Sequence, residues 1–181
     1  KWNEESVFAS RDEWRRECDS VLEAVSGLQG FAGRLSEGPE TLASFFALRD
    51  ALGARVETLH FYAYMSAAVD SSDEEAQALN GRAGSVIGKY RAAVAFAEPE
   101  LLAVGRETLG KWTGDSKELA DYEHWIDNLF RQQEHVRSAE VEELLGSAEE
   151  VFQSINAIHD MQVDSDLKFA PARASDGTEW P

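Results

Sequence analysis

The sequence is short of several residue types, and each shortage excludes a class of protein. One cysteine among 181 residues, Cys18, allows no internal disulfide and cannot supply the thiolates of a zinc ribbon or an iron–sulfur cluster. Lys and Arg number 17 against 34 Asp and Glu, so the net charge is −17 and a nucleic acid or an anionic membrane is disfavoured as partner. The longest apolar run, residues 61–69, is much shorter than a membrane span, and no secretory signal opens the chain. We therefore expect a cytoplasmic protein.

Proline is also scarce, and its positions bear on the fold class. The four prolines leave two long stretches in which apolar residues recur every three or four positions, as in helices, without the alternation of strands. This pattern predicts an all-α fold of about six helices in an elongated bundle. The expected helices run from Ser10 to about Leu35, Pro39 to about Ala68, Ser72 to about Val94, Leu101 to about Trp112, Asp115 to about Val136 and Ser138 to about Ile158.

The helix starts carry recognisable capping signals. Ser10 with Glu13, and Ser72 with Glu75, have the S-x-x-E spacing of a capping box, and Pro39 suits the first position of a helix. The second helix has an additional apolar face near its C-terminal end, which predicts that this end is buried on two sides. That additional face consists of Phe61, Tyr62, Tyr64 and Met65.

The pattern changes after residue 163. Leu167 and Phe169 alternate with polar residues, Pro171 interrupts, and the run Ser175-Asp176-Gly177 is typical of a hairpin turn. We therefore divide the chain into a helical lobe, residues 1–163, and an exit segment, residues 164–181, that begins a short extended hairpin. Because no Met precedes Lys1 and the hairpin is unfinished, we expect the chain to be a fragment.

Motifs of common enzyme classes are absent from the sequence. It contains no G-x-S-x-G, no phosphate-binding G-x-x-x-x-G-K-[ST] and no dinucleotide-binding G-x-G-x-x-G after a strand. None of the four histidines begins the H-E-x-x-H that holds zinc beside a general base. We therefore nominate no catalytic residue and no metal ligand, and Cys18, on an apolar stripe, is interpreted as a core thiol.

Two pairs of side chains could still bind a metal. Glu57 with His60 and Asp121 with His124 each place two ligand types on one helix face, as in di-iron carboxylate bundles. Ordinary surface side chains explain the same spacing in so acidic a chain, and we favour that interpretation. The di-iron bundle stays open as a less favoured alternative.

The aromatic residues near the end of the second helix also have two interpretations. Phe61, Tyr62 and Tyr64 could line a groove for an extended ligand, since tyrosine offers stacking area and a hydroxyl group. Helix packing is the interpretation that we favour, because aromatic residues at helical spacing usually lie in a core.

Taken in order, these segments resemble the N-terminal region of the oligoendopeptidase F family of zinc metallopeptidases. The resemblance extends over nearly the whole chain, and its most specific part matches the family pattern L-x-x-Y followed by R-x-x-x-H-x-L-S-x-x-E-E-x-L-L, with Arg137 and Val141 in place of its Leu and first Glu. This part is carried by Leu119, Tyr122, Arg131, His135, Ser138, Glu142, Leu144 and Leu145. The other matching segments are Trp2-Asn3, Val7-Phe8-Ala9-Ser10 with Glu13-Trp14, Tyr62 and Tyr64 before Asp70-Ser71-Ser72-Asp73, Phe96-Ala97-Glu98-Pro99-Glu100-Leu101, and Asp166-Leu167-Lys168-Phe169.

The resemblance implies a function that the residues alone do not. In this family the N-terminal helical lobe caps a channel that admits short peptides, while zinc and the general-base Glu lie in a C-terminal catalytic domain that this chain lacks. The chain alone should then be inactive, with zinc in the parent enzyme and the catalytic domain and oligopeptides as partners. Tyr62 and Tyr64 are the candidate channel-lining residues. The alternative from another class is a free-standing acidic helical module that docks a basic partner.

Overall fold

The structure is a computed structural model that describes residues 3–133, 155, 158–159, 162–163, 167 and 170–180. The chain divides into two compact units, residues 1–135 and 136–181, and each is described by itself. None of the helices in the described part is long and apolar enough to cross a membrane.

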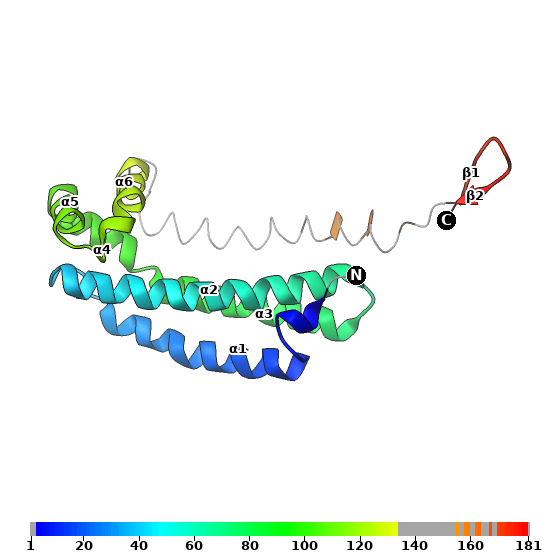
Figure 1. The fold of residues 1–181 in the computed structure, drawn as a ribbon, viewed down its shortest axis with the longest axis horizontal. Helices are drawn as coiled ribbons and strands as arrows, with labels where there is room; N and C mark the ends of the chain where they lie inside the picture. The colour runs from blue at the N-terminus through cyan, green and yellow to red at the C-terminus, as the bar shows by residue number, and fades with distance from the viewer. Residues whose placement is uncertain are drawn as a thin grey trace. The chain divides into compact units, whose positions relative to one another are not determined.

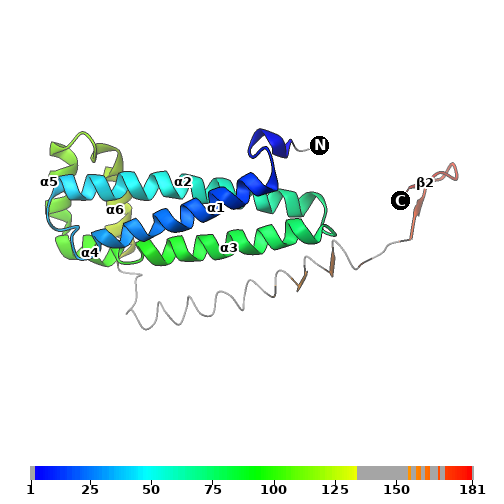
Figure 2. The same ribbon diagram turned by 90° about the horizontal axis from the view of Figure 1, so that it is seen from below.

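In residues 3–133, the described part of the first unit, all regular structure is helical. Three long helices, α1 (Arg11–Val25), α2 (Pro39–Val69) and α3 (Glu74–Val94), pack side by side (Figures 1 and 2). The shorter helices α4 (Ala97–Val104), α5 (Arg106–Asp115) and α6 (Glu123–Gln132) pack on one another near the N-terminal end of α2. Three 3₁₀ turns complete this unit: η1 (Glu4–Ser6), η2 (Ser26–Phe31) and η3 (Ala120–Tyr122). The predicted all-α fold is confirmed.

The described part of the second unit contains a short hairpin. Strands β1 (Ala172–Arg173) and β2 (Glu179–Trp180) are antiparallel, with Ala172 opposite Trp180. The turn between them contains Gly177 at φ +88°, a conformation that favours glycine. The hairpin predicted from Ser175-Asp176-Gly177 is therefore present, but the expectation that it is unfinished is wrong, because both of its strands are paired. The predicted helix from Ser138 to Ile158 lies largely outside the described residues.

Helix α1 begins as its capping box predicts and ends earlier than expected. The Ser10 hydroxyl accepts a hydrogen bond from the Glu13 amide at 3.2 Å, and the Glu13 carboxylate accepts one from the Ala9 amide at 2.8 Å. The α-helix stops at Val25 instead of about Leu35, and the chain continues in η2. Glycines at 27, 30 and 33 weaken helix propensity here, and Gly33 has a positive φ of +78°.

Helix α3 uses another cap than the predicted one. Its N-cap is Asp73, one residue after the expected Ser72, and one Asp73 carboxylate oxygen accepts from the Glu75 and Ala76 amides at 3.0 Å each. Asp and Ser are comparable N-caps, and Asp73 also pairs with an arginine of α1. Sequence spacing alone could not show that additional partner.

The prediction of one helix from Leu101 to Trp112 is wrong. The chain forms two helices there, α4 and α5, which meet at Gly105 with φ +90°. A β-carbon disfavours this backbone conformation, so the glycine lets the chain turn between two short helices. The predicted restart at Glu98-Pro99-Glu100 is present, since both acidic residues lie in the first turn of α4.

The predicted start of the next helix at Asp115 is also wrong. Asp115 is the last residue of α5, and α6 begins at Glu123 after η3. Leu119 is fully buried between the two helices, so its side chain belongs to the core although its backbone is not in an α-helix.

The core lies between α1, α2 and α3 and continues under the short helices. Trp14 is its largest residue, and its indole N–H donates to the Leu59 carbonyl oxygen at 2.9 Å. Cys18 is fully buried, as predicted, and burial raises the pKa of its thiol. The predicted stripes of α1 and α2 contribute a large part of this core, including Trp14, Cys18, Val21, Val25, Phe45, Leu52, Val56, Leu59 and Ala63.

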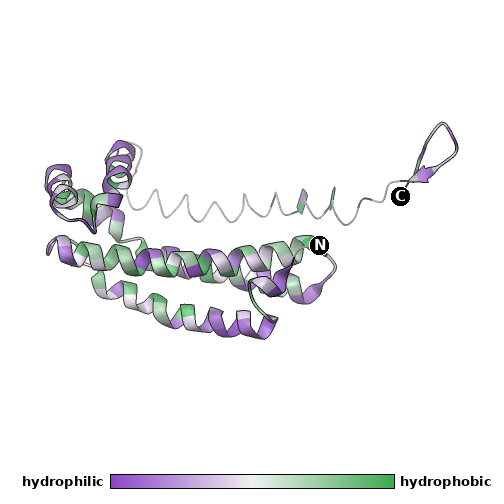
Figure 3. Ribbon diagram, in the orientation of Figure 1, coloured by the Kyte–Doolittle hydropathy of each residue, from purple (hydrophilic) through white to green (hydrophobic). Residues whose placement is uncertain are grey.

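The expectation that the C-terminal end of α2 is buried on two sides is wrong for the described part of the chain. Tyr62 is 2% exposed, whereas Phe61, Tyr64 and Met65 are 58%, 51% and 38% exposed. Figure 3 shows that the ribbon of α2 nevertheless carries apolar residues along its length. One face of this helix end packs on the lobe, and the opposite face presents apolar side chains.

Candidate functional site

The candidate site is the C-terminal end of α2, where the two predicted channel residues point in different directions. Tyr62 and Tyr64 are two positions apart, so a helix directs them to different faces. Tyr62 is buried on the core side, and Tyr64 is half exposed. Of this pair, Tyr64 presents its ring at the surface of the described unit.

Tyr62 packs under the start of the chain. The Phe8 ring meets it edge to face, with ring centroids 5.1 Å apart. Burial, together with the negative charge of Glu4, raises the pKa of the Tyr62 hydroxyl. Tyr62 therefore stays protonated at neutral pH, and its buried ring packs the end of α2 against Phe8.

Tyr64 lies among apolar and aromatic neighbours. The His60 ring is 6.2 Å from the Tyr64 ring and 5.6 Å from the Phe61 ring, measured between centroids. His60 Nδ1 is buried and has no hydrogen-bond partner among the residues that the structure describes. Met65 and Val69, 67% exposed, extend the apolar surface toward the end of the helix. Such a surface is suited to binding an apolar side chain or another helix.

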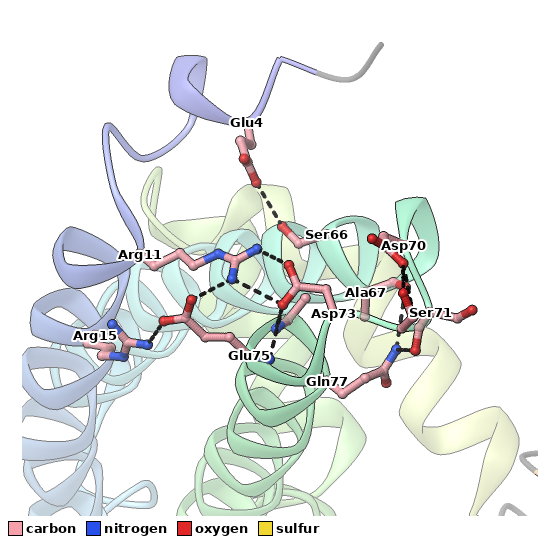
Figure 4. A network of polar contacts seen from close by, with 12 residues as sticks. Glu4, Arg11, Arg15, Ser66, Ala67, Asp70, Ser71, Asp73, Glu75 and Gln77 are labelled. Atoms are coloured by element: carbon pink, nitrogen blue, oxygen red, sulfur yellow. Dashed lines mark hydrogen bonds and ion pairs between the residues drawn. The ribbon is translucent and has the colours of Figure 1, made fainter.

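A polar network holds the turn that follows this helix end (Figure 4). Arg11 of α1 donates to Asp73 at 2.5 Å and to Glu75 at 2.6 Å, and Arg15 also pairs with Glu75. The Ser66 hydroxyl at the end of α2 donates to the Glu4 carboxylate at 3.3 Å. The arginine pairs therefore join the N-terminal ends of α1 and α3, and the separate contact between Ser66 and Glu4 joins the chain start to the end of α2.

The electrostatics of Asp73 follow from these contacts. The Arg11 guanidinium, followed by the Ala76 and Glu75 backbone amides, lowers the pKa of Asp73 to about 2. Hydrogen bonds from Arg15 and Arg11 lower the pKa of Glu75 as well. Both carboxylates are thus ionised throughout the ordinary pH range and act as structural groups.

These contacts were not predicted from the sequence. Their signal is present as two arginines in the first helix and the acidic run that follows Asp70, yet nothing in their spacing shows that they meet. Arg11 and Asp73 are 62 positions apart, and they meet because α1 and α3 pack on each other in the same direction, with their N-terminal ends adjacent.

A second unpredicted cluster surrounds Arg49, near the other end of α2. Its guanidinium carbon lies 4.5 Å from the centroid of the Phe46 ring and 5.0 Å from that of Trp125. The Tyr122 hydroxyl donates to Asp50 at 2.6 Å, and burial with that hydrogen bond raises the pKa of Tyr122 to about 12. This cluster fastens α6 and η3 to α2, which gives Trp125 a structural role.

Among the described residues, the two possible metal pairs belong to no larger ligand cluster. His124 Nε2 lies 3.1 Å from the Asn128 side-chain nitrogen, and the adjacent Asp121 is exposed. Within the described ranges, no three His, Cys, Asp or Glu side chains come together in a way that could hold a metal ion. The di-iron alternative is therefore not favoured.

Comparison with known proteins bears directly on the predicted family. A family model described as oligopeptidase F, Peptidase_M3_N, matches residues 100–169. Oligopeptidase PepF of Bacillus subtilis is 28% identical over 178 residues, which are 98% of this chain. The crystal structure of oligoendopeptidase-F from Enterococcus faecium superposes with a TM-score of 0.80 over 94% of this chain at 25% identity.

The predicted resemblance to the N-terminal region of the oligoendopeptidase F family is confirmed. Group B oligopeptidase PepB of Streptococcus agalactiae is a further relative, 26% identical over 99% of this chain. The matched region is 27% of the Bacillus protein, 30% of the Streptococcus protein and 34% of the Enterococcus chain. The chain thus spans about a third or less of these oligoendopeptidase F relatives.

Proposed function

We propose that this chain is the non-catalytic N-terminal lobe of a zinc oligoendopeptidase, in which it shapes the channel that admits short peptides. The observation that carries the proposal is the match of almost the whole chain, in sequence and in fold, to proteins named oligopeptidases and oligoendopeptidases. The free-standing acidic module has no comparable support.

The proposal assigns the chemistry to the part of the enzyme beyond this chain. Zinc, bound by H-E-x-x-H and a later Glu, would activate a water molecule there for attack on the peptide carbonyl. The lobe would contribute binding and exclusion: it would contact an extended peptide and keep folded proteins from the metal. Its own partners would be the catalytic domain and the oligopeptide substrate.

Tyr64 is the residue that we propose to face the channel. Tyr62, on the core face of the same helix end, is proposed as a positioning residue. The support is the exposure of the Tyr64 ring beside Phe61 and the burial of Tyr62 against Phe8. An exposed tyrosine offers an aromatic face and a hydroxyl group, which suits a peptide backbone with varied side chains.

The test is Tyr64→Ala in the full-length enzyme, assayed with a series of peptides of increasing length. We expect KM to rise severalfold for the longer peptides only, which corresponds to a loss of about 1 kcal/mol of binding free energy. The kcat for the shortest peptide should not change. Tyr64→Phe should retain most of the binding because it keeps the ring. Val7→Ala, which removes another exposed apolar side chain of the lobe, is the control. An unchanged KM for every peptide would contradict the proposal that Tyr64 faces the channel.

A further inference from the structure

The outer face of α2 carries a regular row of exposed residues that the core does not use. These residues are spaced alternately four and three positions apart, and we call them the α2 seam. The seam consists of Ala47, Ala51, Ala54, Thr58, Phe61, Met65 and Ala68. All seven are exposed, whereas the core face of the same helix is made by Leu52, Val56, Leu59 and Ala63. The seam is about 30 Å long at a rise of 1.5 Å per residue.

Alternating spacings of four and three are the signature of helix pairing. They average to a repeat of about 3.5 residues, which keeps a row of side chains facing one partner helix. A helix that is apolar on opposite faces is normally buried on both. Phe61 and Met65, 58% and 38% exposed, lie one helical turn apart, and Val69 follows one turn later. The three side chains therefore form a continuous apolar surface and are not isolated surface residues.

The seam is graded in size along its length. Its first half presents the small residues Ala47, Ala51 and Ala54, which allow a partner backbone to approach closely. Its second half presents the large residues Phe61 and Met65. The complementary surface is therefore a single helix with large apolar residues at one end of its stripe and small residues at the other.

The negative charge beside the seam distinguishes a second copy of this chain from a basic partner helix. Glu57 lies exposed beside the seam, one helical turn before Phe61, and the whole chain carries a net charge of −17. A second copy paired antiparallel about Thr58 would bring the two Glu57 side chains close together, which disfavours self-association. A partner helix with Lys or Arg beside its apolar stripe would gain from the same glutamate.

We propose that the α2 seam is the docking surface for one amphipathic helix, basic along one flank, from the part of the oligoendopeptidase beyond this chain. This inference rests on the proposed function. The relatives supply the necessary length, because the matched region is only 27% to 34% of each of three relatives. Tyr64 lies at the margin of the seam on the Glu57 side, so the docking helix would form a border of the proposed channel.

The test compares the reactivity of a thiol on the seam in two proteins. Met65→Cys is prepared in the 181-residue chain and in the full-length enzyme, and both are labelled with a maleimide. The native Cys18 is fully buried and its pKa is raised by burial, so it gives little background. Ala78→Cys, exposed on α3 away from the seam, is the matched control.

We expect the thiol at position 65 to react about tenfold or more slowly in the full-length enzyme than in the short chain, because labelling must wait for local opening. The thiol at position 78 should react equally in both. Equal rates at position 65 would overturn the proposal. Slow labelling already in the short chain would overturn it as well: a dimeric mass would assign the seam to a second copy, and a monomeric mass would assign it to another segment of this chain.

Two further readouts keep the inference separate from the proposed function. Peptidase activity of the full-length protein reports on the function, so an active enzyme with a reactive thiol at position 65 would refute only the docking surface. A protected thiol in a protein without peptidase activity would refute only the function. Phe61→Glu should lower the thermal midpoint of the full-length enzyme more than that of the short chain, and equal shifts would contradict docking.

Discussion

At the scale of single residues, Asp73 joins two helix ends through one carboxylate. It caps α3 through the Glu75 and Ala76 amides and pairs with Arg11 at the start of α1. Its partners come from two helices that are far apart in sequence. Substitution of Asp73 should therefore remove two contacts that hold the turn before α3: the helix cap and the ion pair. That turn directly follows the helix end that carries Tyr64.

Asp73→Asn should therefore lower the free energy of unfolding of the chain more than Glu74→Gln does. Both changes remove one negative charge from the N-terminal end of α3, but only Asp73 has Arg11 as partner. Thermal or urea unfolding followed by circular dichroism measures the difference. Equal losses for the two variants would mean that the network contributes nothing beyond the helix dipole.

The same residue makes a prediction about acid. The pKa of Asp73 is about 2 in the folded chain against an ordinary value of 3.8, so the unfolded chain takes up the proton first as the pH falls. The stabilisation is then complete above about pH 4 and is lost progressively as the pH approaches 2. Urea unfolding at several pH values should show a shallower loss for Asp73→Asn over this window. Parallel curves for the two proteins would contradict the assignment.

At the scale of helices and turns, Gly105 separates α4 from α5 by its backbone conformation. Its φ of +90° is costly for a residue with a β-carbon, although an added β-carbon would meet no atom within 4 Å outside the neighbouring residues. Gly105→Ala should therefore destabilise the chain by about 1–2 kcal/mol. Gly84 lies within α3 with the same open surroundings and an ordinary helical φ.

Gly84→Ala is thus the matched control, and it should stabilise the chain by about 0.5–1 kcal/mol because alanine restricts the unfolded chain. Chemical denaturation of the two variants measures both effects. A Gly105→Ala variant as stable as the original would show that the junction of α4 and α5 does not depend on the glycine.

The helices illustrate which parts of the fold the sequence could predict. Trp14, Cys18 and Val21 lie where the apolar stripe of α1 placed them, because burial follows helical periodicity. The junction at Gly105 was missed because a glycine within a helical pattern does not reveal its φ. The candidate site was predicted only as a helix end rich in aromatics, since contacts such as Arg11 with Asp73 arise from packing between distant segments.

At the scale of the whole molecule, the described part of the chain combines a packed core with an exposed apolar face. Its core is well formed between α1, α2 and α3, yet α2 also presents the apolar seam on its outer face. The relatives are about three to four times as long as the region that this chain matches, and the docking helix that we propose would come from their remaining length. The proposed lobe function and the proposed docking surface are consistent with each other at this scale.

Hydrolysis of a peptide series by the full-length protein that contains this chain is the most direct test of the proposed function. The account predicts zinc-dependent cleavage of short unfolded peptides, loss of cleavage on removal of the metal, no cleavage of folded proteins, and no activity in the 181-residue chain alone. Activity of the short chain, or a full-length protein that cleaves no peptide with zinc bound, would contradict it.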